Sequence, residues 1–128
     1  MSAIKIYLAG PMRSYPAYNH PTFDKAAAYL RAAGFEVFSP AEEDRKRFPD
    51  RDWPNMTGDP IIDNIGLGDM RTIIKADLIW ICENADAIVF LPDAEKSKGA
   101  RCERALGEFL NLELRHIDPD TGALTDAH

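Results

Sequence analysis

The sequence predicts an α/β fold in which a parallel sheet of about four to five strands is flanked by helices. Short aliphatic segments alternate with helical patterns along the chain, which is typical of parallel sheets. Glycines and prolines separate these segments. The length of 128 residues and the hydrophobic content of 45% suit one compact domain, residues 1–128, with a sizeable core.

The first half of the chain predicts a strand, a helix and a second strand. Residues 4–9 form an aliphatic strand pattern that ends at Gly10 and Pro11. Pro21 suits the first turn of a helix that ends at Gly34, and residues 35–38 follow as a short strand. The expected buried stripe of this helix is Phe23, Ala26, Ala27 and Leu30.

Residues 40–68 carry no sustained period. They contain four prolines, two charge clusters and Trp53. A loop of this length within a compact domain is usually functional or mobile.

The second half predicts a helix over residues 70–83, a strand over 86–91, a helix over 97–110 and a strand over 112–117, followed by a polar tail. The first of these helices has one broad apolar face that includes a carboxylate, Asp77. Burial without a partner would raise the pKa of this carboxylate.

The helix that begins after Ser97 has the features of an anion site. Ser97 is a predicted N-cap, and backbone N–H groups and the positive helix end would face a bound anion. Glu103 lies roughly 9 Å further along the axis, a distance comparable to that from a nucleotide's phosphate to its sugar. The expected core face of this helix is Cys102, Ala105, Leu106 and Phe109. Beside it runs a second stripe of Gly99, Glu103 and Gly107.

In parallel sheets, ligands bind beyond the carboxyl ends of the strands, where the loops of residues 10–13 and 97–99 should meet. Two carboxyl groups in one crevice, one ionised and one protonated, suit cleavage at an anomeric carbon. Glu103 would attack or stabilise C1′ while Asp77 handles the leaving base. Arg13 would pair with a phosphate near Ser97, and Tyr7 would orient Glu103. Each of these residues also has a purely structural interpretation. Glu103 could be a solvated helix residue and Asp77 a carboxylate at the helix edge. Arg13 could lie on the surface, and Tyr7 could belong to the core.

A net charge of −6 argues against an extended surface for a nucleic-acid polymer. Cys82 and Cys102 lie in helical patterns without metal-ligand spacing, so we expect buried thiols in a reducing compartment. We find neither a signal peptide nor an 18-residue apolar stretch, and we expect a cytoplasmic protein with no membrane partner.

Four segments resemble the nucleoside 2-deoxyribosyltransferase family, which includes 2′-deoxynucleoside 5′-monophosphate N-glycosidases. The segments are Lys5 to Arg13 (KIYLAGPMR), Asp77-Leu-Ile-Trp, Asp86-Ala-Ile-Val and Ser97-x-Gly-x-x-x-Glu103. The resemblance covers roughly residues 3–117 and implies a Rossmann-like sheet of the deoxyribosyltransferase type.

The resemblance implies that Glu103 is the nucleophile on C1′, that Asp77 assists the leaving base and that Tyr7 orients the glutamate. Between Asp77 and Asp86 this chain has one residue more than its relatives, and Glu83 is the alternative for the role of Asp77. Ser97 stands where monophosphate glycosidases bind the 5′-phosphate and nucleoside-specific transferases carry an aspartate. The predicted substrate-binding residues are Gly10, Pro11, Met12, Arg13, Asn19, Ser97 and Gly99. Asn19, His20 and Phe23 lie in the region where relatives shape the base pocket.

The expected activity is therefore release of the base from a 2′-deoxynucleoside 5′-monophosphate, with base exchange as a possible side activity. No cofactor or metal is implied. Relatives build their sites across dimer interfaces, so we expect a homodimer or a higher homo-oligomer. Two alternatives stay open. The first is a ribonucleotide phosphoribohydrolase, which is disfavoured because Pro92-Asp93-Ala94 replaces the usual Pro-Gly-Gly loop. The second is a nucleotide-binding or interaction module without catalysis. The sequence does not identify the base.

Overall fold

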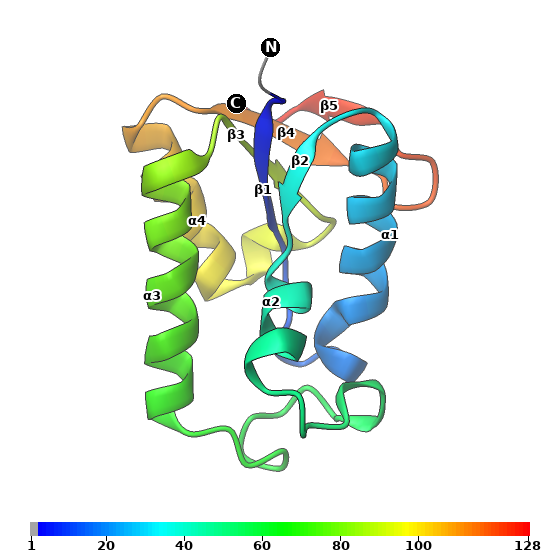
Figure 1. Cartoon of the computed structure of the whole chain (residues 1–128), viewed down its shortest axis with the longest axis vertical. Coiled ribbons are helices and arrows are strands. Elements are labelled where there is room, and N and C mark those ends of the chain that lie inside the picture. Colours follow the sequence, from blue (N-terminus) through cyan, green and yellow to red (C-terminus); the bar gives the residue numbers. More distant parts are fainter. Residues whose placement is uncertain (1–2) are drawn as a thin grey trace.

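The computed structural model describes residues 3–128 as a mostly parallel sheet with helices on both faces (Figure 1). The strand order is β2-β1-β3-β4-β5, in which the first four strands are parallel and β5 is antiparallel to β4. The strands are β1 (Lys5–Ala9), β2 (Glu36–Phe38), β3 (Ala87–Phe90), β4 (Glu113–Ile117) and β5 (Leu124–Asp126). The helices are α1 (His20–Ala32), α2 (Pro40–Arg47), α3 (Leu67–Asn84) and α4 (Lys98–Phe109). The predicted α/β class is confirmed.

The two central strands are apolar on both faces, as expected for strands covered by helices on each side. One face of β1, with Ile6 and Leu8, packs under α1. The other face, with Tyr7 and Ala9, packs against residues of α3 and α4. In Figure 1, α3 and α4 lie on one side of the sheet and α1 lies on the other. Alternate residues of one strand therefore belong to two separate cores.

The predicted core face of α4 is wrong. Its buried residues are Ala100, Glu103 and Gly107, whereas Phe109 is 82% exposed. The reason is close helix–sheet packing, because a Cβ atom at Gly107 would lie 2.6 Å from Ile88 Cδ1. The stripe of small residues approaches the sheet. In the more apolar stripe, Leu106 is partly buried against the core, and Cys102, Ala105 and Phe109 are exposed.

The expected burial of the two cysteines is also wrong. Cys82 in α3 and Cys102 in α4 are both free and exposed. Each lies next to a residue that faces the sheet, Ile81 or Glu103, so its own side chain points away from the core.

Residues 40–68, for which the sequence predicts no element, begin with α2 and continue as an ordered loop. The Ser14 N–H donates to the Gly58 carbonyl at 2.8 Å, and the Ala17 N–H donates to the Met56 carbonyl at 2.9 Å. The loop therefore packs on the segment that follows β1. Within residues 3–128, no helix is both long and apolar enough to cross a membrane.

Candidate active site

Tyr7 and Glu103 form the centre of the candidate site. The Tyr7 hydroxyl donates a hydrogen bond of 2.5 Å to Glu103 Oε2, and both side chains are buried. Strand β1 supplies the phenol, and the sheet-facing side of α4 supplies the carboxyl group. The contact predicted between these two residues is confirmed, and the close approach of α4 at Gly107 makes it possible.

Burial controls the protonation of both groups. Burial raises the pKa of Glu103 to about 8, although the hydrogen bond from Tyr7 lowers this pKa. It also raises the pKa of Tyr7 well above its usual value, and the neighbouring Glu103 and Asp77 charges add to this effect. Tyr7 is therefore a hydrogen-bond donor at neutral pH, and Glu103 exchanges its proton near neutrality.

Asp77 of α3 is the second carboxyl group of the cluster. It is 4% exposed, and Oδ1 has no hydrogen-bond partner among residues 3–128. Burial raises its pKa to about 7, while the nearby Tyr7 hydroxyl has the opposite effect. The raised pKa predicted for Asp77 is confirmed. Glu83, the alternative for its role, is exposed near the end of α3.

Aromatic rings pack against Tyr7 in this cluster. The ring of Tyr7 stacks on Phe38 with 5.4 Å between centroids, and Phe38 lies 4.8 Å from Trp80. These rings come from β1, β2 and α3.

Asp44 of α2 is a further buried acid, which the sequence pattern does not reveal. It is 4% exposed, and its pKa is raised to about 7, first by burial and then by the charge of Asp77. Its ion-pair partner is Arg47 Nη1 at 3.4 Å. Residues 40–47 contain charged residues at most positions, so no periodic signal marks this one as buried.

The loop after β1 is held by its own contacts. A Cβ atom at Gly10 would lie 2.8 Å from Leu91 Cβ, so the backbone needs a glycine there. Asn19 Nδ2 donates to the Pro11 carbonyl at 2.9 Å, and Met12 packs against the core under α1. Asn19 therefore supports the loop directly.

The loop after β1 also contacts the loop after β3, through residues other than 10–13 and 97–99, whose meeting stays a prediction. The Tyr15 hydroxyl donates to Asp93 Oδ2 at 3.0 Å. Arg13 is exposed and forms no hydrogen bond or ion pair within the described chain. Its predicted pairing with a phosphate therefore stays a prediction.

Ser97 is the N-cap of α4, as predicted, and its Oγ accepts a hydrogen bond of 3.2 Å from the Ala100 N–H. Gly99 is not closely packed, because a Cβ atom there would meet only Ser97 Oγ, at 3.9 Å. His20 and Phe23 are both buried, and Phe23 belongs to the core under α1.

Two surface pockets of about 500 Å³ lie away from the carboxyl groups. One lies between α1 and residues 119–120, and the other is beside the end of β4. No group of three or more His, Cys, Asp or Glu side chains within residues 3–128 is arranged to hold a metal ion. The candidate site is thus defined by buried, proton-exchanging groups.

Fold and site together define an α/β protein with carboxyl groups of raised pKa buried close to strand β1. Residues 4–115 match the family described as "Domain of unknown function (DUF4406)", and the chain belongs to this family. No curated protein matches the chain.

Proposed function

We propose that this protein is an N-glycosidase that cleaves 2′-deoxynucleoside 5′-monophosphates into a free base and deoxyribose 5-phosphate. The observation that carries the proposal is the 2.5 Å hydrogen bond between Tyr7 and Glu103, with Asp77 buried in the same cluster. Pairs of buried carboxyl groups with raised pKa values are typical of glycosidase sites.

The reactive form has its charge on Glu103 and its proton on Asp77. With pKa values of about 8 and about 7, this is the less populated of the two singly ionised forms, and it arises when a proton moves from Glu103 to Asp77. In the first step, the Glu103 carboxylate of this form attacks C1′ as the bond between C1′ and the base nitrogen breaks. The protonated Asp77 gives its proton to the departing base, and a glycosyl ester with Glu103 remains. In the second step, water attacks C1′ and gives a proton to Asp77, and Glu103 leaves as a carboxylate. The Tyr7 hydroxyl orients Glu103 throughout.

The substrate's phosphate would lie at the start of α4. Ser97, the backbone N–H groups of the first turn and the helix dipole all favour an anion there. Arg13 would add a charge-assisted hydrogen bond. Because Glu103 and Asp77 are at most 5% exposed, a substrate must displace groups that now cover them.

The test is to incubate the protein with each 2′-deoxynucleoside 5′-monophosphate and to measure the free base by chromatography. Ribonucleotides and unphosphorylated deoxynucleosides serve as matched controls. Base release from the deoxynucleotides alone is expected. Equal cleavage of ribonucleotides would support the phosphoribohydrolase alternative, and binding without cleavage would support a nucleotide-binding module. The expected homodimer also stays a prediction, which light scattering can test.

A further inference from the structure

Two aromatic side chains beside the buried carboxyl groups have no role in the reaction proposed above. Phe38 of β2 and Trp80 of α3 are both partly exposed, whereas Tyr7 is fully buried. The ring centroid of Trp80 lies 6.4 Å from that of Tyr7 and 4.8 Å from that of Phe38. The Tyr7 hydroxyl in turn donates to Glu103. The two partly exposed rings therefore lie next to the residue that orients the proposed nucleophile.

Trp80 also lies close to the proposed proton donor. It follows Asp77 by three residues in α3, and side chains with this spacing are neighbours on a helix, with roughly 5–6 Å between their Cβ atoms. The other neighbours of Asp77 along the helix are Ile73, Ile74 and Ile81, so Trp80 is the one among them with a flat aromatic face. A base that receives a proton from Asp77 is therefore within reach of an indole ring.

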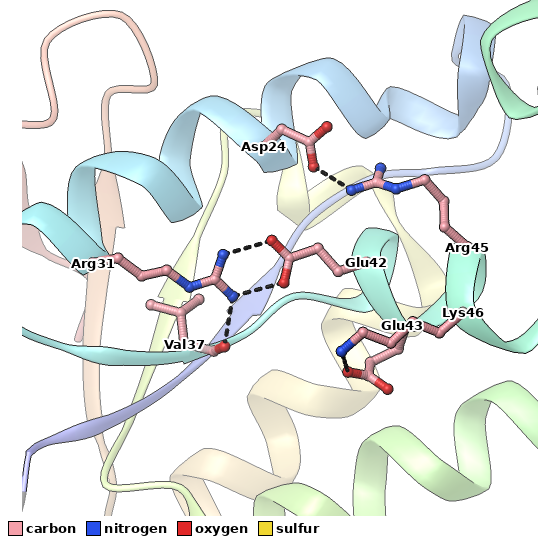
Figure 2. Close-up of polar contacts among 7 residues, drawn as sticks. All are labelled: Asp24, Arg31, Val37, Glu42, Glu43, Arg45 and Lys46. Carbon is pink, nitrogen blue, oxygen red and sulfur yellow. Dashed lines mark hydrogen bonds and ion pairs between the residues drawn. The ribbon is translucent and has the colours of Figure 1, made fainter.

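The segment that carries Phe38 is fixed on both sides by Arg31 of α1 (Figure 2). Arg31 Nη2 donates to the Val37 carbonyl at 3.0 Å, and Nη1 and Nη2 each donate to an oxygen of Glu42 at 2.6 Å. Phe38 lies between these two contacts in the chain, and its ring stacks on Tyr7. Trp80 therefore packs on a support that is in place before any ligand binds. A flat ligand can then bind without the entropic cost of ordering these side chains.

We propose that Trp80, supported by Phe38, is the platform on which the base of the nucleotide stacks. This inference rests on the function proposed above. The nucleotide then has its phosphate at Ser97, C1′ at Glu103 and its base between Asp77 and Trp80. Stacking on an aromatic side chain contributes roughly 10- to 100-fold in affinity, and it suits purines and pyrimidines alike because every base has a π face.

The first experiment uses tryptophan emission, because the chain has only two tryptophans, Trp53 and Trp80. Trp53→Phe combined with Glu103→Gln leaves Trp80 as the single reporter in a protein that keeps the nucleotide intact. Titration with a 2′-deoxynucleoside 5′-monophosphate should cause a saturable loss of Trp80 emission, since a stacked base quenches an indole. Deoxyribose 5-phosphate, which has no base, should compete with the nucleotide without causing this loss.

The matched control is Trp80→Phe combined with Glu103→Gln, in which Trp53 is the reporter. Trp53 is 4% exposed and stacks on His20, so its emission should not change. Unchanged Trp80 emission over the whole titration, or an equal loss with deoxyribose 5-phosphate, would overturn the inference. If wild-type protein releases the base while Trp80 does not respond, only the platform fails. If Trp80 responds but no nucleotide is cleaved, the proposed function fails while the platform stands.

The kinetics of Trp80→Leu supply the second test. Loss of stacking should raise KM about 10- to 100-fold, with kcat changed less than about twofold, because the base stacks in the ground state and in the transition state alike. Inhibition by deoxyribose 5-phosphate should stay the same, and Trp80→Phe, which keeps a ring, should recover most of the loss. A Trp80→Leu protein that binds the nucleotide and deoxyribose 5-phosphate with equally reduced affinity would show that Trp80 only supports the fold.

Discussion

The two sides of α2 use charge in opposite ways. On the α1 side, Arg31 and Glu42 form a double hydrogen bond of 2.6 Å while both stay partly exposed. On the other side, Asp44 and Asp77 are each 4% exposed, and Asp77 Oδ1 is unpartnered within residues 3–128. The helix thus separates a set of ordinary ion pairs from a cluster of buried acids.

The pKa values show what this difference means. Hydrogen bonds from Arg31 hold the pKa of Glu42 below its usual value, so this contact stabilises the fold at neutral pH. Burial raises the pKa values of Asp44, Asp77 and Glu103, so their ionisation destabilises the fold. Buried acids with raised pKa values lower the stability of a protein at neutral pH, and such groups are typical of functional sites.

The largest expected effect in the buried cluster is on turnover. Glu103→Gln keeps the shape of the side chain but removes the nucleophile, so kcat should fall at least about 1,000-fold. Mass spectrometry of wild-type protein treated with a slow 2′-fluoro analogue should find the sugar phosphate adduct on the peptide that contains Glu103. Normal turnover in Glu103→Gln, or an adduct elsewhere, would remove this residue from the mechanism.

Asp77→Asn should lower kcat about 100-fold, because the amide cannot give a proton to the base. The alkaline limb of the pH profile should also flatten, since it reports the loss of this proton. The measurement is kcat from pH 5 to pH 9. A folded variant with full activity would mean that Asp77 has only a structural role.

The stability of the buried cluster should depend on pH. In the unfolded chain these carboxyl groups titrate near pH 4, whereas in the folded protein they titrate near pH 7 to 8. The folded state therefore binds more protons in this range, and the free energy of unfolding should fall as pH rises from about 4 to about 8.

Glu103→Gln should reduce this loss and stabilise the protein at pH 8 by about 1 to 2 kcal/mol, with little change at pH 4. Urea unfolding at the two pH values tests this. Equal effects at both pH values would mean that the Glu103 carboxyl group does not ionise in this range.

Ser97→Ala should weaken selection for the phosphate. The lost cap and phosphate hydrogen bond together correspond to about 1 to 2 kcal/mol, or roughly tenfold in kcat/KM. The comparison is between a deoxynucleotide and the corresponding deoxynucleoside, and only the deoxynucleotide should be affected. Wild-type protein that cleaves both equally well would refute a phosphate site at this helix.

The smallest effect is expected on the α1 side of α2. Arg31→Gln should destabilise the fold by about 0.5 kcal/mol at neutral pH, because partly exposed ion pairs contribute little. This contribution should disappear as pH falls through the lowered pKa of Glu42, where the carboxylate becomes protonated. Urea unfolding of the variant and the wild type at pH 7 and pH 3 measures it. A loss that persists at pH 3 would point to packing of the arginine side chain.

The sequence by itself determined the order of the elements. Strands β1 to β4 and helices α1, α3 and α4 lie within a few residues of their predicted positions, because hydrophobic periodicity and turn residues are local signals. The cap at Ser97 followed from the same kind of signal. Helix α2 and strand β5 were missed, since α2 has a very polar sequence and β5 lies in the polar tail.

Only the tertiary structure decided which face of each helix is buried. Leu106 and Phe109 suggested one face of α4, but the close approach at Gly107 turns Glu103 toward Tyr7 instead. Asp44 is buried although α2 is very polar, and the ion pairs from Glu42 and Arg45 that hold α2 against α1 join residues far apart in the chain. Such choices depend on contacts between residues far apart in the chain, which no local pattern records.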